Sequence, residues 1–171
     1  LVDFEEAGDL TIFIDDAQIK VIEEQMKEKG YLDATYLKST FSLLRANDMI
    51  WSFVVNNYLL GKDPFPFDLL YWNDDAVNLP EAMHSYYLRN MYLENNLIKK
   101  NKLKIKDTPI DITKVKTPSY FLSTKEDHIA PWKATYQTTQ YFSGHCTFTL
   151  AASGHIAGVV NPPKAKKYSH W

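Results

Sequence analysis

An aspartate and a histidine that each follow a short apolar run are the residues of this sequence best placed to do chemistry. Asp127 comes soon after the run Ser119–Ser123. His155 comes soon after Cys146–Leu150, and the segment Pro131–Phe142 between the two runs is expected to be a helix. Two strands joined by a helix of this length are most simply parallel, in a right-handed crossover. We therefore expect both residues at the same edge of a sheet, where open α/β sheets carry their chemistry.

The order of the two residues suits an acid–base pair. An acid after one strand and a histidine after the next match the last two members of a nucleophile–acid–histidine triad. Asp127 would fix the imidazole tautomer of His155 and stabilise the imidazolium that forms during catalysis. Gly154 and Gly158 would let the histidine loop bend and let substrate approach. The competing interpretation is an aspartate that caps its own loop and a surface histidine.

Two further residues bear on this hypothesis. His128 could pack beside the acid and shape a substrate cleft, or it could be the functional histidine itself. Its place directly after Asp127 argues against a pair between those two. Cys146 is the only cysteine, and it shares a strand face with Phe148 and Leu150, which indicates a small buried apolar residue. It lies outside the strand-to-helix turn that a nucleophile requires, so the sequence offers an acid and a base but no nucleophile.

The first hundred residues are predicted to be mainly helical. Asp16 is expected to cap a helix that ends at Gly30, and a second helix follows Asp33. A third covers about Met49–Leu60, and a fourth runs from Pro80, at its first helical position, to about residue 97. After residue 99, a short strand or hairpin arm is expected at residues 103–105.

Three residues near the middle of the chain have two interpretations each. Trp72 follows a stretch with two prolines in three residues, and it is either part of the core or an apolar wall of a substrate cleft. Arg45 and Asp48 form either an ion pair at a helix end or a site for an anionic group. We favour the ion pair.

Composition narrows the class of protein. The 171 residues are 45% hydrophobic and 23% charged, as in ordinary globular domains. A net charge of −2 argues against a nucleic-acid-binding module, and one cysteine excludes an internal disulfide framework and a cysteine-only zinc site. The apolar runs are too short to span a membrane, and no signal peptide is visible, although the chain opens on Leu1 rather than methionine. We expect no metal site and a reducing compartment.

Several blocks of sequence are specific enough to indicate a family. They are Phe41–Trp51, Asn57–Asn73, Tyr87–Asn90, Lys125–Trp132, Ala152–Pro163 and Ser169–Trp171. These blocks resemble class I polyhydroxyalkanoate synthases, also called poly-β-hydroxybutyrate polymerases. The resemblance covers essentially the whole chain and corresponds to a C-terminal portion of their catalytic domain.

The resemblance implies a fold and an activity. The fold would be α/β: a partial α/β-hydrolase fold with a helical cap inserted on its N-terminal side. Residues 1–75 would be the mainly helical cap, and residues 76–171 the C-terminal part of the catalytic domain. The activity would be an acyl transfer that polymerises 3-hydroxyacyl-CoA and releases CoA. Asp127 and His155 match the family's acid and general base, and Trp72 falls in a segment that lines its active-site cleft.

The resemblance also implies partners, and it leaves alternatives open. No cofactor is expected, because CoA is part of the substrate and a product. A polyester granule surface, a homodimer of the whole enzyme and a cytoplasmic location are expected. The family's nucleophilic cysteine lies N-terminal to this sequence and Cys146 does not match it, so the isolated chain should be inactive. The alternatives are an esterase or depolymerase of the same fold, and a non-catalytic remnant or interaction module.

Overall fold

The computed structural model describes residues 2–44, 46, 50–64, 75–156 and 158–171. They form two compact units, one of Leu1–Ile19 with Ser85–Trp171 and the other of Lys20–His84. The sequence-based boundary at residue 75 therefore differs from the division of the structure, because the first nineteen residues belong with the C-terminal part. The role of the helical part as a cap stays a prediction.

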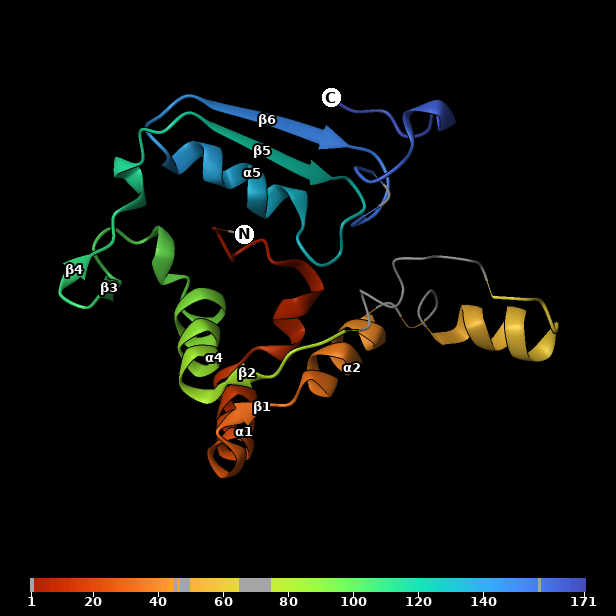
Figure 1. Ribbon diagram of the computed structural model, residues 1–171. Helices are drawn as coiled ribbons and strands as arrows, with labels where there is room; N and C mark the ends of the chain where they lie inside the picture. The colour runs from red at the N-terminus through yellow and green to blue at the C-terminus, as the bar shows by residue number, and fades with distance from the viewer. Residues whose placement is uncertain (1, 45, 47–49, 65–74, 157) are drawn as a thin grey trace. The chain divides into compact units, whose positions relative to one another are not determined.

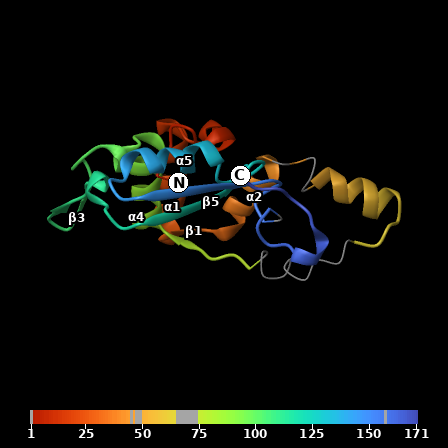
Figure 2. The ribbon, with the colours of Figure 1, turned by 90° about the horizontal axis from the view of Figure 1, so that it is seen from above.

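A strand–helix–strand unit forms the centre of the C-terminal part. Strand β5 (Ser119–Thr124) pairs in parallel with β6 (Cys146–Ala151), and Phe121 lies opposite Phe148. Helix α5 (Trp132–Tyr141) connects them and lies along one face of the pair, as Figure 1 shows. The two strands also lie side by side when seen from above (Figure 2). The predicted parallel crossover is confirmed.

Aromatic rings join α5 to this sheet. The ring centroids of Phe121 and Phe142 are 5.7 Å apart, and those of Tyr136 and Phe148 are 5.1 Å apart. Both pairs meet edge to face, the geometry that aromatic quadrupoles favour. The opposite face is less covered within the described residues, because Tyr120 is 63% exposed there. The helix therefore covers one face of the strand pair.

The short elements before this unit agree with the predicted hairpin arm. Strand β3 (Lys104–Ile105) pairs antiparallel with β4 (Thr108–Pro109). The described residues of the same unit also include short 3-10 helices, at Gly8–Phe13, Asn96–Ile98, Ile112–Lys114 and Pro163–Ala165. These turns connect the longer elements without adding strands to the sheet.

A buried carboxylate ties the N-terminal residues to the rest of this part. The Oδ2 atom of Asp3 accepts a hydrogen bond of 2.7 Å from the Tyr141 hydroxyl at the end of α5. Its Oδ1 atom accepts from the Asn95 side chain at 2.7 Å and from the Glu5 amide at 3.0 Å. Burial raises the pKa of Asp3, but these three hydrogen bonds together outweigh it and the pKa is lowered. The bond to Asp3 also raises the pKa of Tyr141 to about 12.

The first long helix starts one residue earlier than its predicted cap implies. Helix α1 spans Asp16–Lys29, and the Oδ1 atom of Asp15 accepts a hydrogen bond of 2.7 Å from the Gln18 amide. Asp15 is therefore the N-cap, and the assignment of Asp16 was wrong. Asp16 instead forms an ion pair with Arg89 at 3.0 Å. Gly30 ends the helix with a φ of +75°, as predicted.

Helix α2 (Ala34–Leu44) follows in the second unit. Asp33 caps it, since its Oδ1 atom accepts hydrogen bonds from the amide and the hydroxyl of Thr35. Just before this helix, β1 (Tyr31–Leu32) pairs antiparallel with β2 (Leu79–Pro80). This pairing joins two segments that are far apart in the sequence.

The third and fourth predicted helices contain wide turns. The described part of the third includes a π-helix, Val54–Leu59, and Gly61 follows with a φ of +62°. Helix α4 (Glu81–Tyr87) continues into a second π-helix, Leu88–Leu93. Pro80 belongs to β2 and precedes α4, so its predicted place at the first helical position was one residue too early. Both helices are confirmed, although propensity gave no sign of their π turns.

Candidate active site

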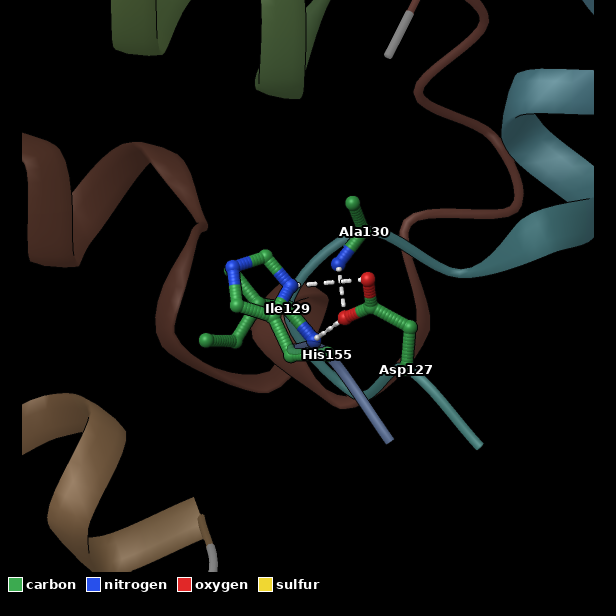
Figure 3. A network of polar contacts seen from close by, with 4 residues as sticks. All are labelled: Asp127, Ile129, Ala130 and His155. Atoms are coloured by element: carbon green, nitrogen blue, oxygen red, sulfur yellow. Dashed lines mark hydrogen bonds and ion pairs between the residues drawn. The ribbon is translucent and has the colours of Figure 1, made fainter. Parts of the chain in front are cut away.

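The two residues predicted to work together are in contact. The Nδ1 atom of His155 lies 2.8 Å from the Oδ2 atom of Asp127, as Figure 3 shows. The distance is within hydrogen-bond reach, so the predicted proximity is confirmed. Asp127 follows the end of β5 and His155 follows the end of β6, and parallel strands place both loops at the same edge of the sheet.

The aspartate is held in place by its own loop. The Oδ1 atom of Asp127 accepts hydrogen bonds of 2.9 Å from the amides of both Ile129 and Ala130. Its side chain is only 8% exposed. The two interpretations of Asp127 are therefore compatible, because one carboxylate oxygen caps the loop while the other binds His155. A carboxylate fixed at both oxygens can hold the imidazole in one orientation.

The histidine side chain, unlike that of Asp127, is open to solvent. Its side chain is 45% exposed, and the Nε2 atom points away from Asp127 (Figure 3). An ionised carboxylate only accepts hydrogen bonds, so a neutral His155 that pairs with Asp127 carries its proton on Nδ1. Nε2 is then a proton acceptor. This is the tautomer that a general base needs, with the acceptor nitrogen turned toward a reacting group.

Backbone hydrogen bonds join the two loops beyond the ends of the strands. The Lys125 amide donates to the Ala151 carbonyl at 2.8 Å, and the Glu126 amide donates to the Ser153 carbonyl at 3.0 Å. The parallel pairing thus continues past β5 and β6 almost to Asp127 and His155. Relative movement of the loops would break these bonds, so they restrain the spacing of these two residues.

The residues that allow the bend differ from those predicted. Ser153, rather than Gly154, has the left-handed φ of +75°. A Cβ atom on Gly154 would meet nothing within 4 Å, so no close approach requires that glycine. Gly158 is required, because its Cβ atom would lie 2.1 Å from the Ala152 carbonyl oxygen. The sequence missed Ser153, since serine is not among the residues that favour this conformation.

The other predicted site residues are less well defined. His128 is half-buried in the loop of Asp127, and its role in a cleft stays a prediction. Trp72, Arg45 and Asp48 lie outside the described residues, so their interpretations also stay predictions.

Cys146 lies at the wrong end of its strand to act with His155. It begins β6, whereas His155 follows the end of that strand. At about 3.3 Å per residue, the length of β6 alone separates the two by roughly 17 Å. The thiol is free and half-buried, and its Sγ atom lies 3.5 Å from the Gly144 carbonyl oxygen. This geometry agrees with a structural role.

Neither a metal site nor a membrane-spanning helix is found in the described part of the chain. No group of three or more histidine, cysteine, aspartate or glutamate side chains there could hold a metal ion. Likewise, none of the described helices is both long and apolar enough to cross a membrane.

Comparisons with known proteins give a matching fold family and several similar sequences. Residues 17–162 match the family described as alpha/beta hydrolase fold. The chain is 52% identical over 170 residues to the poly(3-hydroxyalkanoate) polymerase subunit PhaC of Rhizobium meliloti, covering 99% of the chain and 28% of that protein. It is 52% identical over 165 residues to a poly(3-hydroxyalkanoate) polymerase of Methylorubrum extorquens, covering 96% and 27%.

A third relative extends the comparison to a more distant sequence. The chain is 43% identical over 176 residues to the poly(3-hydroxyalkanoate) polymerase subunit PhaC of Cupriavidus necator, covering 100% of the chain and 30% of that protein. The chain therefore spans less than a third of the length of these curated relatives.

Proposed function

The chain belongs to the α/β hydrolase-fold family, and from that premise we propose that it supplies the general base and the orienting acid of a polyhydroxyalkanoate-forming acyltransferase. The observation that carries the proposal is the contact of 2.8 Å between His155 Nδ1 and Asp127 Oδ2, which leaves Nε2 turned outward. The printed names of the relatives supply the reaction class, since each is a poly(3-hydroxyalkanoate) polymerase.

The proposed chemistry uses each group of the pair in a defined way. His155 Nε2 takes the proton of a cysteine thiol elsewhere in the whole enzyme, and the thiolate attacks the thioester carbonyl of a 3-hydroxyacyl-CoA. The carbon–sulfur bond to CoA breaks, and CoA leaves as a thiol after it receives the proton. His155 then takes the proton of a 3-hydroxyl group, whose oxygen attacks an enzyme-bound acyl thioester and forms the ester bond. The carbon–sulfur bond to the cysteine breaks, and its thiolate takes up the proton from His155. Asp127 stabilises the imidazolium at each stage.

The wider assignments belong to the same proposal. The substrate class is 3-hydroxyacyl-CoA, and CoA is a product rather than a resident cofactor. The whole enzyme is proposed to act as a cytoplasmic homodimer at a polyester granule surface. The family resemblance supports these assignments. The pair of Asp127 and His155 would serve the same roles in each copy.

The proposal is tested on the full-length enzyme supplied with 3-hydroxybutyryl-CoA. CoA release is followed with a thiol reagent, and the products are separated into polymer and free hydroxybutyrate. Polymer that disappears in His155→Ala supports the proposal. Free hydroxybutyrate as the sole product would show the alternative, a hydrolase of the same fold. His145→Ala is the matched control, because His145 is exposed and precedes the far end of β6.

A second experiment addresses the isolated chain. Residues 1–171 should release no CoA above the buffer rate, because a base and an orienting acid without a nucleophile do not form a catalytic unit. Restored activity on adding the missing N-terminal portion would support a shared site. Release from the isolated chain that His155→Ala abolishes would instead reveal a nucleophile within these residues.

A further inference from the structure

The outer edge of β6 is occupied by the segment Ser169–Trp171. The Trp171 amide donates to the Leu150 carbonyl at 2.8 Å, and the Leu150 amide donates to the Trp171 carbonyl at the same distance. The Ala152 amide donates to the Ser169 carbonyl at 2.7 Å. Figure 1 shows the C-terminus beside the end of β6. The segment therefore pairs with β6 where the strand leads into the His155 loop.

This pairing places the start of the histidine loop between two other segments. On one side, the amides of Lys125 and Glu126 donate to the carbonyls of Ala151 and Ser153. On the other side, Ser169 accepts from the Ala152 amide. Consecutive backbone groups from Ala151 to Ser153 thus bond alternately to the acid loop and to the C-terminal segment. The backbone leading to His155 is restrained from both sides.

A side-chain contact links the same C-terminal segment to the acid loop. The Nζ atom of Lys125 lies 5.7 Å from the centroid of the Trp171 ring. An ammonium at this distance from an indole ring is attracted by the ring's quadrupole. Lys125 is two residues before Asp127 in the chain. Trp171 therefore contacts the loop of the acid through its ring and the strand of the base through its backbone.

We propose that Ser169–Trp171 is a positioning element that sets the contact between Asp127 and His155. The proposal rests on the proposed function of that pair. A segment that only covered the sheet edge would need its backbone bonds alone. The contact between Lys125 and Trp171 adds a connection to the second loop, so the segment restrains both partners of the 2.8 Å hydrogen bond.

The test uses the full-length enzyme and three variants, Trp171→Ala, Trp171→Phe and Lys125→Met. Trp171→Ala and Lys125→Met should each lower kcat about two- to fivefold, as expected from loss of a partly exposed cation–π contact, with KM unchanged. Trp171→Phe keeps an aromatic face and should recover part of the loss. The double variant should lose no more than either single one, because both changes remove the same contact. Lys133→Met on α5 is the matched control, since this lysine is also exposed.

A spectroscopic measurement separates positioning from general stability. The proton on His155 Nδ1, bonded to Asp127, should give a low-field NMR signal without substrate, and ring ¹⁵N shifts report the tautomer. Trp171→Ala and Lys125→Met should broaden or shift this signal, and Lys133→Met should not. An unchanged signal with unchanged kcat in both variants would overturn the proposal, as would losses that multiply in the double variant. If Trp171→Ala does not fold, the kcat values and NMR signals of Trp171→Phe and Lys125→Met test the proposal instead.

The NMR measurement also separates the proposed acyltransferase function from the proposed positioning role of Ser169–Trp171. A wild-type enzyme that forms no polymer would refute the proposed function. The signal of the Asp127–His155 hydrogen bond would still show whether Trp171 and Lys125 set that contact.

Discussion

Two regions differ in the contacts that their side chains make: the ends of β5 and β6, and the helical segment Ile50–Leu59. At the strand ends, Asp127 has hydrogen-bond partners for both carboxylate oxygens. In the helical segment, large apolar side chains face outward, with Tyr58 84% exposed and Leu59 66% exposed. The first region therefore contains the contacts that position it, and the second leaves its apolar surface uncovered within the described residues.

The polar residues of the helical segment sharpen this contrast. No charged residue occurs from Ile50 to Gly61. The Asn56 side chain donates to the Ser52 carbonyl at 3.0 Å, and the Asn57 side chain donates to the Lys62 carbonyl at 2.9 Å. The first amide thus bonds to the backbone of its own helix and the second to the backbone just past the helix end, while large apolar side chains remain exposed. The hydrophobic pattern of the sequence predicts where both regions lie. It does not predict which region has side chains with hydrogen-bond partners and which leaves apolar side chains exposed.

The largest effect is expected at the strand ends. Asp127→Asn in the full-length enzyme should lower kcat by about 10⁴-fold, the loss that the equivalent change causes in Ser-His-Asp enzymes, because the amide selects the wrong imidazole tautomer. The rate of CoA release measures it. Asp107→Asn, at an exposed position, is the control and should keep full activity. Turnover that survives Asp127→Asn would remove the acid from the proposed pair.

A second effect concerns the buried carboxylate of the same unit. Tyr141→Phe removes the 2.7 Å bond to Asp3 and should lower the free energy of unfolding by about 1–3 kcal/mol near neutral pH, measured by urea denaturation. Tyr136→Phe, in the same helix, is the matched control, because the Tyr136 side chain is partly exposed and the phenylalanine ring can still pack on Phe148. Equal stability of the two variants would contradict a supporting role for the bond.

The pH dependence of that effect has a defined sign. The pKa of Asp3 is lowered in the folded protein from its ordinary 3.8. Such a carboxyl contributes its full stabilisation above the ordinary value and loses it as the pH falls through the folded-state pKa. The stability difference between wild type and Tyr141→Phe should therefore shrink below about pH 4, where the unfolded carboxyl begins to protonate. A difference that grows on acidification would be inconsistent with this hydrogen bond.

A smaller effect is expected in the histidine loop. Ser153 has a φ of +75°, which costs a non-glycine residue about 1–2 kcal/mol. Ser153→Gly removes this cost, but glycine also gains freedom in the unfolded chain, which offsets part of the gain. The free energy of unfolding should therefore rise by about 0.5–1 kcal/mol. Ser153→Ala keeps the same backbone cost and serves as control. Thermal denaturation measures both, and a destabilised glycine variant would show that the serine side chain has a contact of its own.

The smallest effect is expected in the helical segment. Tyr58→Ala removes a side chain that is mostly exposed, so the free energy of unfolding should change by less than about 0.5 kcal/mol. The fully buried Met26 lies in the same unit, and Met26→Ala should cost about 2–5 kcal/mol by the same denaturation measurement. A large loss from Tyr58→Ala would mean that this segment has stabilising contacts after all.

The sequence predicts the strand–helix–strand unit well because local patterns determine it. The apolar runs at Ser119–Ser123 and Cys146–Leu150 and the proline before α5 are visible without a structure, and they suffice to bring Asp127 and His155 together. Glycine also marks the end of a helix at Gly30, because glycine adopts a positive φ without steric cost.

The missed features depend on geometry that residue type does not encode. Asp15 and Asp16 are chemically identical as caps, so only the observed hydrogen bond to Gln18 distinguishes them. The left-handed Ser153 accepts a backbone hydrogen bond from Glu126 in the other loop, a contact that residue type does not reveal. The pairing of Ser169–Trp171 with β6 is a non-local contact with no periodic signal. Local hydrogen-bond geometry therefore explains the first of these errors, and contacts between distant segments account for the other two.

The bond between Asp3 and Tyr141 has a consequence for the order of events during synthesis. The two residues are 138 positions apart in the chain. A ribosome that adds about 5–20 residues per second needs roughly 7 to 30 s to pass from one to the other. Throughout that interval the carboxylate of Asp3 stays hydrated and its segment has no docking partner in α5. The residues around Asp3 are thus made well before α5 and docked late, so nascent chains stalled before Tyr141 should expose them to proteases.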